Sequence, residues 1–189
     1  ETNKPQAYDA LLQGLDQLRK DSEDSTNKAI EYFEKAIEID PGYRRAYAAL
    51  AAANWRIVVS NWFSAAGGGF SRAWHSLNTN LEKARGTALG HSITAEVLAQ
   101  QGQCDEAFQE INKALSIAPN DSDIYISKAK VLNAIGRAAE AEDAARWAMR
   151  LDPQYSPEYL RVLARSVFNQ KRYDEAIETL QRVVKQQSD

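Results

Sequence analysis

A recurring pattern of alanine and proline is the strongest constraint on what this chain can fold into. Residues 28–43, 106–121 and 140–155 each place a small residue, an apolar residue four positions on, an alanine three further and a proline five further. The positions are Ala29, Phe33, Ala36 and Pro41; Ala107, Ile111, Ala114 and Pro119; Ala141, Ala145, Ala148 and Pro153; and, without the proline, Ala176, Leu180 and Val183. This spacing puts the first three residues on one helical face, and the proline ends the helix. We therefore predict amphipathic helices with a defined stop.

The distance between equivalent prolines gives the length of the repeating unit. Pro119 and Pro153 are 34 residues apart, which leaves room for a second helix before each proline-terminated one. Gly102 and Gly136 lie where those preceding helices should end. Because glycine readily adopts the left-handed conformation, it suits such a turn. The sequence thus predicts a repeated helix-turn-helix unit.

A 34-residue helix-turn-helix unit with small residues where helices touch resembles the tetratricopeptide repeat (TPR) family. The resemblance implies an all-α, right-handed superhelical solenoid of about five units, forming a single array over residues 1–189. The repeats lie at about 7–41, 44–89, 90–121, 122–155 and 157–187. We call the first helix of each unit its A helix and the second its B helix.

Repeat 2 contains an aromatic insertion. Ala36 and Ala84 take equivalent places but are 48 residues apart, fourteen more than one repeat, so we predict an extended helical hairpin with an insertion at about 55–74. It carries Trp55, Trp62, Phe63, Phe70 and Trp74 around three consecutive glycines. Two interpretations stay open. Either the rings pack together and cap the neighbouring repeat, or some are exposed and form a homodimer or partner surface.

Composition excludes several classes of partner. The net charge is −3 and no stripe of lysine and arginine is present, so we expect neither nucleic-acid binding nor direct membrane binding. The longest uncharged run, residues 57–71, is shorter than the roughly 20 apolar residues of a membrane span. We expect a soluble fragment of a longer protein.

The sequence also lacks the usual marks of an enzyme. His75, His91 and Cys104 are isolated from one another, and we interpret the histidines as ordinary polar residues. The glycines at 67–69 are not followed by the lysine and serine or threonine of a phosphate-binding loop. We predict a non-catalytic chain without a metal or cofactor.

The TPR resemblance implies a concave groove, lined by A helices, that receives an extended peptide or a partner helix. Carried onto this chain, the family's groove positions include Lys130, Asn133, Arg161, Arg165, Phe168 and Asn169. The charged and amide groups among them would suit a carboxylate or an acidic peptide, and the alternative is an ordinary solvated surface. Chaperone-binding members use lysine and asparagine where repeat 2 has Ala48 and Ala52, which argues against a chaperone adaptor.

Residues 3–18 and 28–55 have a closer resemblance, to the TPR region of bacterial class III adenylate and guanylate cyclases and of related signalling regulators. It implies a scaffold or interaction module, the accessory region of a larger signalling protein with a protein or peptide partner. A small-molecule-sensing domain that relays to an attached catalytic domain is the alternative. The compartment stays open between the cytoplasmic and the periplasmic face of a bacterial membrane-associated protein.

Overall fold

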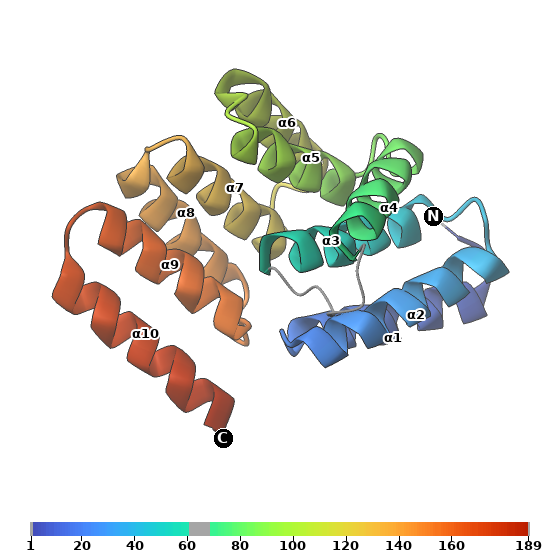
Figure 1. Ribbon diagram of the computed structural model, residues 1–189, viewed down its shortest axis with the longest axis horizontal. Coiled ribbons are helices and arrows are strands. Elements are labelled where there is room, and N and C mark those ends of the chain that lie inside the picture. The colour runs from blue at the N-terminus through green and yellow to red at the C-terminus, as the bar shows by residue number, and fades with distance from the viewer. Residues whose placement is uncertain (1, 61–68, 189) are drawn as a thin grey trace. The chain divides into compact units, whose positions relative to one another are not determined.

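The computed structural model describes residues 2–60 and 69–188, which form ten helices and no strand (Figure 1). The helices are α1 (Pro5–Arg19), α2 (Glu23–Ile39), α3 (Arg44–Ser60), α4 (Gly69–Lys83), α5 (Ala88–Gln100), α6 (Cys104–Ile117), α7 (Ser122–Ala134), α8 (Ala138–Leu151), α9 (Pro157–Asn169) and α10 (Tyr173–Ser188). They follow one another as five A and B pairs, from α1 and α2 to α9 and α10. The predicted all-α fold of about five helix-turn-helix units is confirmed.

The predicted stops lie one residue before each proline. Asp40, Ala118 and Asp152 cap α2, α6 and α8, with φ of −134°, −133° and −124°. Because the proline ring disfavours helical backbone at the preceding residue, each cap turns away from the helix. Its N–H still donates to the alanine carbonyl four residues back, at 3.0 Å in all three helices. Alanine and proline together therefore set the end of each B helix.

The described turns between an A helix and its B helix each use a left-handed residue. Gly102 and Gly136 have φ of 77° and 83°, as the sequence predicted. After Gly136, the N–H of Arg137 donates to the carbonyl of Leu132 at 2.8 Å, which satisfies a terminal carbonyl of α7. Lys171 takes the same role between α9 and α10 with φ of 63°, a conformation that costs more for a residue with a side chain.

The described chain divides into two compact units, Glu1–Ile93 and Thr94–Asp189, with the boundary inside α5. The single array predicted from sequence stays a prediction. In unit 1, α2 and α3 pack through Phe33, Ala46, Ala49 and Leu50. A Cβ atom built on Gly14 would lie 2.3 Å from Cε1 of Phe33, so only glycine lets α1 approach that ring.

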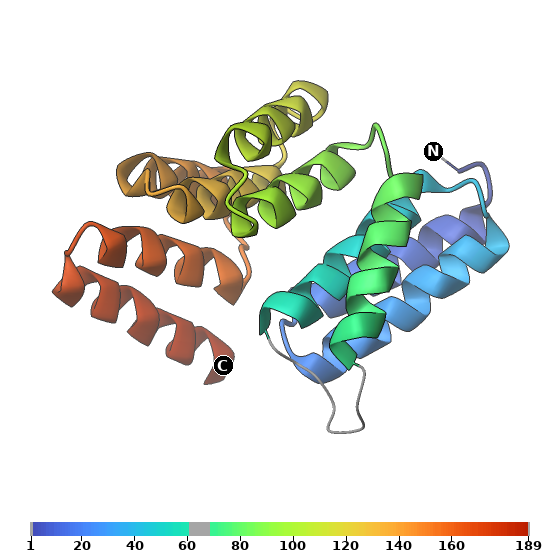
Figure 2. The same cartoon turned by 45° about the horizontal axis from the view of Figure 1, so that its top comes forward.

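Unit 2 is built on the same plan. The buried alanines of α8 face three apolar residues of α9, Tyr159, Val162 and Leu163. On the other side of α9 lies α10, and Figure 2 shows the two helices side by side. All nine repeat residues of the three proline-terminated segments are 0% exposed. Leu180, the equivalent residue of α10, is 46% exposed.

Of the two helices that flank the insertion, α3 is longer than the other A helices, whereas α4, with 15 residues, lies within the 14 to 17 residues of the other B helices. α3 has 17 residues, whereas the A helices α5, α7 and α9 have 13 each. α4 begins at Gly69, the last of the three glycines. The tip of the predicted hairpin, with Trp62 and Phe63, lies outside the described residues.

Candidate interaction surface

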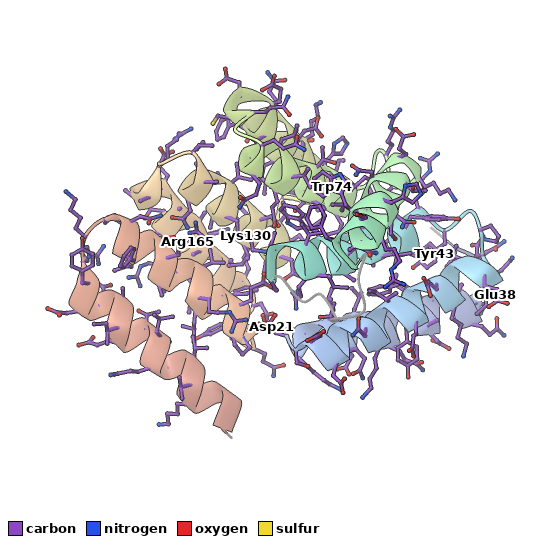
Figure 3. All side chains as sticks on the ribbon, viewed as in Figure 1. Asp21, Glu38, Tyr43, Trp74, Lys130 and Arg165 are labelled. Carbon is purple, nitrogen blue, oxygen red and sulfur yellow. The ribbon has the colours of Figure 1, made fainter. Side chains whose placement is uncertain are left out.

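Polar side chains connect the A helices of unit 2 along one edge. The hydroxyl of Ser127 on α7 donates to Glu96 on α5 at 2.6 Å. Nζ of Lys130 lies 3.4 Å from the Glu96 carboxylate and 2.6 Å from that of Glu158 on α9. Lys130 therefore connects the carboxylates of two neighbouring A helices, and Figure 3 shows its side chain with that of Arg165.

An amide and hydroxyl network continues this edge toward the helix ends. Nδ2 of Asn133 donates to Oγ of Ser166 at 2.9 Å, and Oδ1 of Asn133 accepts from Asn169 at 3.2 Å. The Ser166 hydroxyl donates in turn to the carbonyl of Val162 at 2.9 Å. Asn133 and Ser166 are buried, and these bonds offset the cost of removing them from water. We call Glu96, Ser127, Lys130, Asn133, Glu158, Ser166 and Asn169 the polar ladder.

A tyrosine adds a third contact between α7 and α9. The hydroxyl of Tyr159 donates to the carboxylate of Asp123 at 2.8 Å. Burial raises the pKa of Tyr159, and the negative charge of Asp123 raises it further, so the phenol stays protonated and keeps donating. The ring of Tyr155 stacks on that of Tyr159 with centroids 6.0 Å apart. Together with the ladder, this contact fixes α9 against α7.

The six candidate groove residues fall into different environments. Asn133 and Asn169 come together, but Lys130 pairs with two carboxylates, so its charge is already balanced. Arg161 is half-buried, and burial lowers its pKa. The remaining members, Arg165 and Phe168, are exposed on α9. Among these six residues, Arg165 on α9 is the most exposed positive charge, and the cationic patch stays a prediction.

The ladder also contains Glu96, Ser127 and Ser166, none of which the sequence analysis singled out. Glu96 lies 34 positions before Lys130, so the two occupy the same position in consecutive repeats. A carboxylate and a lysine one repeat apart on A helices predict an ion pair between those helices. The predicted start of repeat 3 at residue 90 obscures this signal, because it lies two residues too late to align Glu96 with Lys130.

The aromatic candidates of repeat 2 also differ among themselves. Trp55 is buried in α3. Phe70 is half-exposed at the start of α4 and stacks on Trp74, with centroids 6.0 Å apart and an interplanar angle of 7°. Trp62 and Phe63 lie outside the described residues. Of the predicted hairpin surface, the described part thus offers one stacked pair.

Within residues 2–60 and 69–188, no three histidine, cysteine, aspartate or glutamate side chains converge as a metal site requires. In the same residues, no helix is long and apolar enough to cross a membrane.

Comparison with known proteins supports tetratricopeptide repeats. Two family models described as tetratricopeptide repeat match residues 21–43 and 127–189. The small glutamine-rich tetratricopeptide repeat-containing protein 2 of Mycosarcoma maydis is 32% identical over 78 residues. That stretch is 41% of this chain and 22% of the relative, so the chain spans only a fraction of that protein's length.

Solved structures share the fold. The thermophilic TPR protein TTC0263 of Thermus thermophilus has a TM-score of 0.65 at 19% identity, over 95% of this chain and 91% of its own. Yeast Tom70 has a TM-score of 0.58 at 19% identity, over 96% of this chain and 38% of its own. TPR proteins mediate protein–protein interaction, and their fold is generally a non-enzymatic module.

Proposed function

We propose that this chain is a non-catalytic interaction module whose α9 A-helix face binds an acidic segment of a partner protein. The observation that carries the proposal is the exposed group formed by Arg165 and, about one turn further along α9, Phe168 and Asn169. Arg165 and Asn169 offer donors to carboxylates, and Phe168 offers an apolar contact to a neighbouring side chain. Arg161 extends the group by one turn.

The polar ladder gives this group a fixed position. Asn133 and Ser166 tie α9 to α7 beneath it, and Lys130 ties α9 to α7 at the other end through Glu158. A surface that is already ordered loses less conformational entropy when a ligand binds. Near Lys130, the carboxylates of Glu96 and Glu158 repel a negatively charged ligand. This repulsion favours binding of the acidic segment at the Arg165 end of α9.

Binding of matched peptides tests the proposal. A fluorescein-labelled peptide of alternating glutamate and leucine is titrated with the protein, beside a peptide of equal length with lysine in place of glutamate. We expect binding of the acidic peptide alone. Arg165→Glu should weaken it at least about tenfold, since a charge-assisted hydrogen bond is lost and a repulsion added. Arg72→Glu, an equal charge change at an exposed position of α4, should leave it unchanged. Equal affinity for both peptides contradicts the proposal.

We further propose that the module is the accessory region of a larger bacterial signalling protein such as a nucleotide cyclase, and that the repeat 2 hairpin forms a homodimer there. The resemblance over residues 3–18 and 28–55 supports the first part, and the half-exposed Phe70 supports the second. Light scattering of a Trp62→Ser, Phe63→Ser double variant tests the dimer. If wild-type protein dimerises and the variant does so equally, the hairpin is not the interface.

A small-molecule-sensing role is the second candidate, favoured by the Phe70 and Trp74 stack. A planar ligand that joined this stack would quench the fluorescence of Trp74. Titration of candidate metabolites against wild-type protein and Trp74→Phe isolates that signal from the other tryptophans. Saturable quenching that disappears in the variant supports sensing, and quenching that persists in it counts against this site.

A further inference from the structure

The A helices of unit 2 carry negative charge at the end opposite to Arg165. Asp123 lies in the first turn of α7, and Glu158 lies in the first turn of α9. The hydroxyl of Tyr159 on α9 donates to the carboxylate of Asp123 at 2.8 Å, so these two helix starts are held together. Asp123 is exposed and Glu158 is partly exposed. We call Asp123 and Glu158 the acidic end of this face.

The surroundings of the acidic end keep an excess of negative charge. Nζ of Lys130 lies 2.6 Å from the Glu158 carboxylate and 3.4 Å from that of Glu96, so two carboxylates share one ammonium group. Asp123 adds a third carboxylate, and the tyrosine that donates to it is neutral. Arg161, one turn after Glu158, offsets part of this charge. Three carboxylates less one lysine and one arginine leave one negative charge, so a cation is attracted here and an anion is repelled.

Glu158 and Arg165 lie on the same side of α9. They are seven residues apart, which is two helical turns to within about 20° and a rise of about 10 Å along the helix axis. An extended segment in the polyproline II conformation has three residues per turn, so its residues i and i+3 face the same side about 9 Å apart. The opposite charges of α9 are therefore separated by about one three-residue step of such a segment.

We propose that the acidic segment bound by α9 also carries a lysine or arginine, three residues from the glutamate or aspartate that contacts Arg165, and that this basic residue pairs with the acidic end. The pairing presupposes the interaction module proposed above and specifies its ligand as a segment with charges of both signs. Two pairs of opposite sign also fix the register, because a shift that brought a carboxylate to Asp123 would be repelled. A uniformly acidic segment lacks the second pair.

Peptides that differ in one residue test the second pair. The glutamate and leucine peptide, with blocked termini and glutamate at both ends, is extended by two prolines and a lysine at its C-terminus in one version and at its N-terminus in another. Reference peptides carry glutamine in place of the lysine. We expect the lysine to tighten binding about twofold to fivefold in one of the two versions, as an exposed ion pair does. A peptide of the same composition with the lysine directly beside the glutamate should gain less, because the lysine then falls short of the acidic end.

Matched variants identify the partner of the lysine. Asp123→Asn removes the charge but keeps an oxygen that accepts from Tyr159, and it should remove most of the gain. Asp143→Asn, at an exposed position of the B helix α8, should keep the gain. A full gain in Asp123→Asn overturns the proposal, as does a lysine that tightens binding in neither version. If the glutamine peptides bind and are weakened by Arg165→Glu while the lysine adds nothing, only the second pair fails. If no peptide binds, the proposed ligand site on α9 fails with it.

Discussion

The two units hold their A helices by different means. In unit 1, α3 packs on its neighbours through small residues, among them Ala46, Ala49 and Ala53. In unit 2, α5, α7 and α9 are connected by the polar ladder. Alanine allows close approach but leaves no donor or acceptor at the surface, whereas the ladder keeps polar groups at the edge. A helices can thus pack with or without a surface suited to polar ligands.

Unit 1 contains a largely buried ion pair between Arg56 of α3 and Asp21, at the end of α1. Arg56 lies 3.0 Å from the carboxylate of Asp21 and donates to the carbonyl of Leu18 at 2.6 Å. Asp21 has φ of 55°, so the ion pair is formed at the turn between α1 and α2. This contact connects the A helices α1 and α3 at the end of α1, through one arginine and not through a row of polar groups. This difference is the reason for proposing that the ligand binds to unit 2.

The largest effect is expected from the core of unit 1. Phe33→Ala should lower the free energy of unfolding by about 3–5 kcal/mol, because it removes a fully buried ring and leaves a cavity. Phe168→Ala, at an exposed ring on α9, should change it by about 0.5 kcal/mol or less. Urea unfolding followed by circular dichroism measures both. Equal losses would mean that the packing of α2 on α3 does not hold unit 1 together.

A smaller loss is expected where α1 meets that ring. Gly14→Ala should cost about 1–3 kcal/mol, since the added methyl would lie 2.3 Å from Phe33 and force the helices apart. Gly42→Ala is the control, because its Cβ would meet only Asp40 Oδ1, at 3.5 Å. Thermal unfolding of the two variants should differ clearly. A Gly14→Ala variant as stable as Gly42→Ala would show that α1 can shift without cost.

The polar ladder predicts a loss confined to unit 2. Lys130→Met should cost about 1–3 kcal/mol, because the buried Glu96 carboxylate keeps the hydroxyl of Ser127 but loses its counter-charge. Adding Glu96→Gln should restore part of the loss, as a double-mutant cycle would measure. Lys113→Met, which breaks an exposed pair with Glu110, should cost well under about 1 kcal/mol. Amide hydrogen exchange tells which unit is affected.

The smallest effect is a dependence on pH. Burial raises the pKa of Glu142, but hydrogen bonds from Gln170 and Arg146 and the charge of Arg172 outweigh it, so the pKa lies below its ordinary value of 4.5. A lowered pKa in the folded state adds stability above 4.5 that is lost as pH falls below it. Glu142→Gln should therefore destabilise at neutral pH and approach wild type in acid. A stability difference that stays constant with pH would contradict this assignment.

The sequence predicted the fold far better than the surfaces. Alanines and prolines at fixed spacing specify where B helices pack and stop, because both effects act within a single helix and its nearest neighbour. The environment of Lys130 depends instead on Glu96 and Glu158, which approach it only after three A helices are assembled. The exposure of Leu180 is similar, since its own segment matches the buried ones and, among the described residues, the helix packed on α10 is α9. Local pattern therefore cannot tell a covered face from an open one.

The most direct test of the proposed interaction module is a map of where an acidic peptide binds. Backbone amide NMR spectra of the protein are recorded during titration with the glutamate and leucine peptide, with the lysine and leucine peptide as control. The account predicts saturable shifts at Arg165, Phe168 and Asn169 and at their neighbours on α7, with α1 to α4 unchanged. Shifts confined to unit 1, or equal shifts with both peptides, would contradict it.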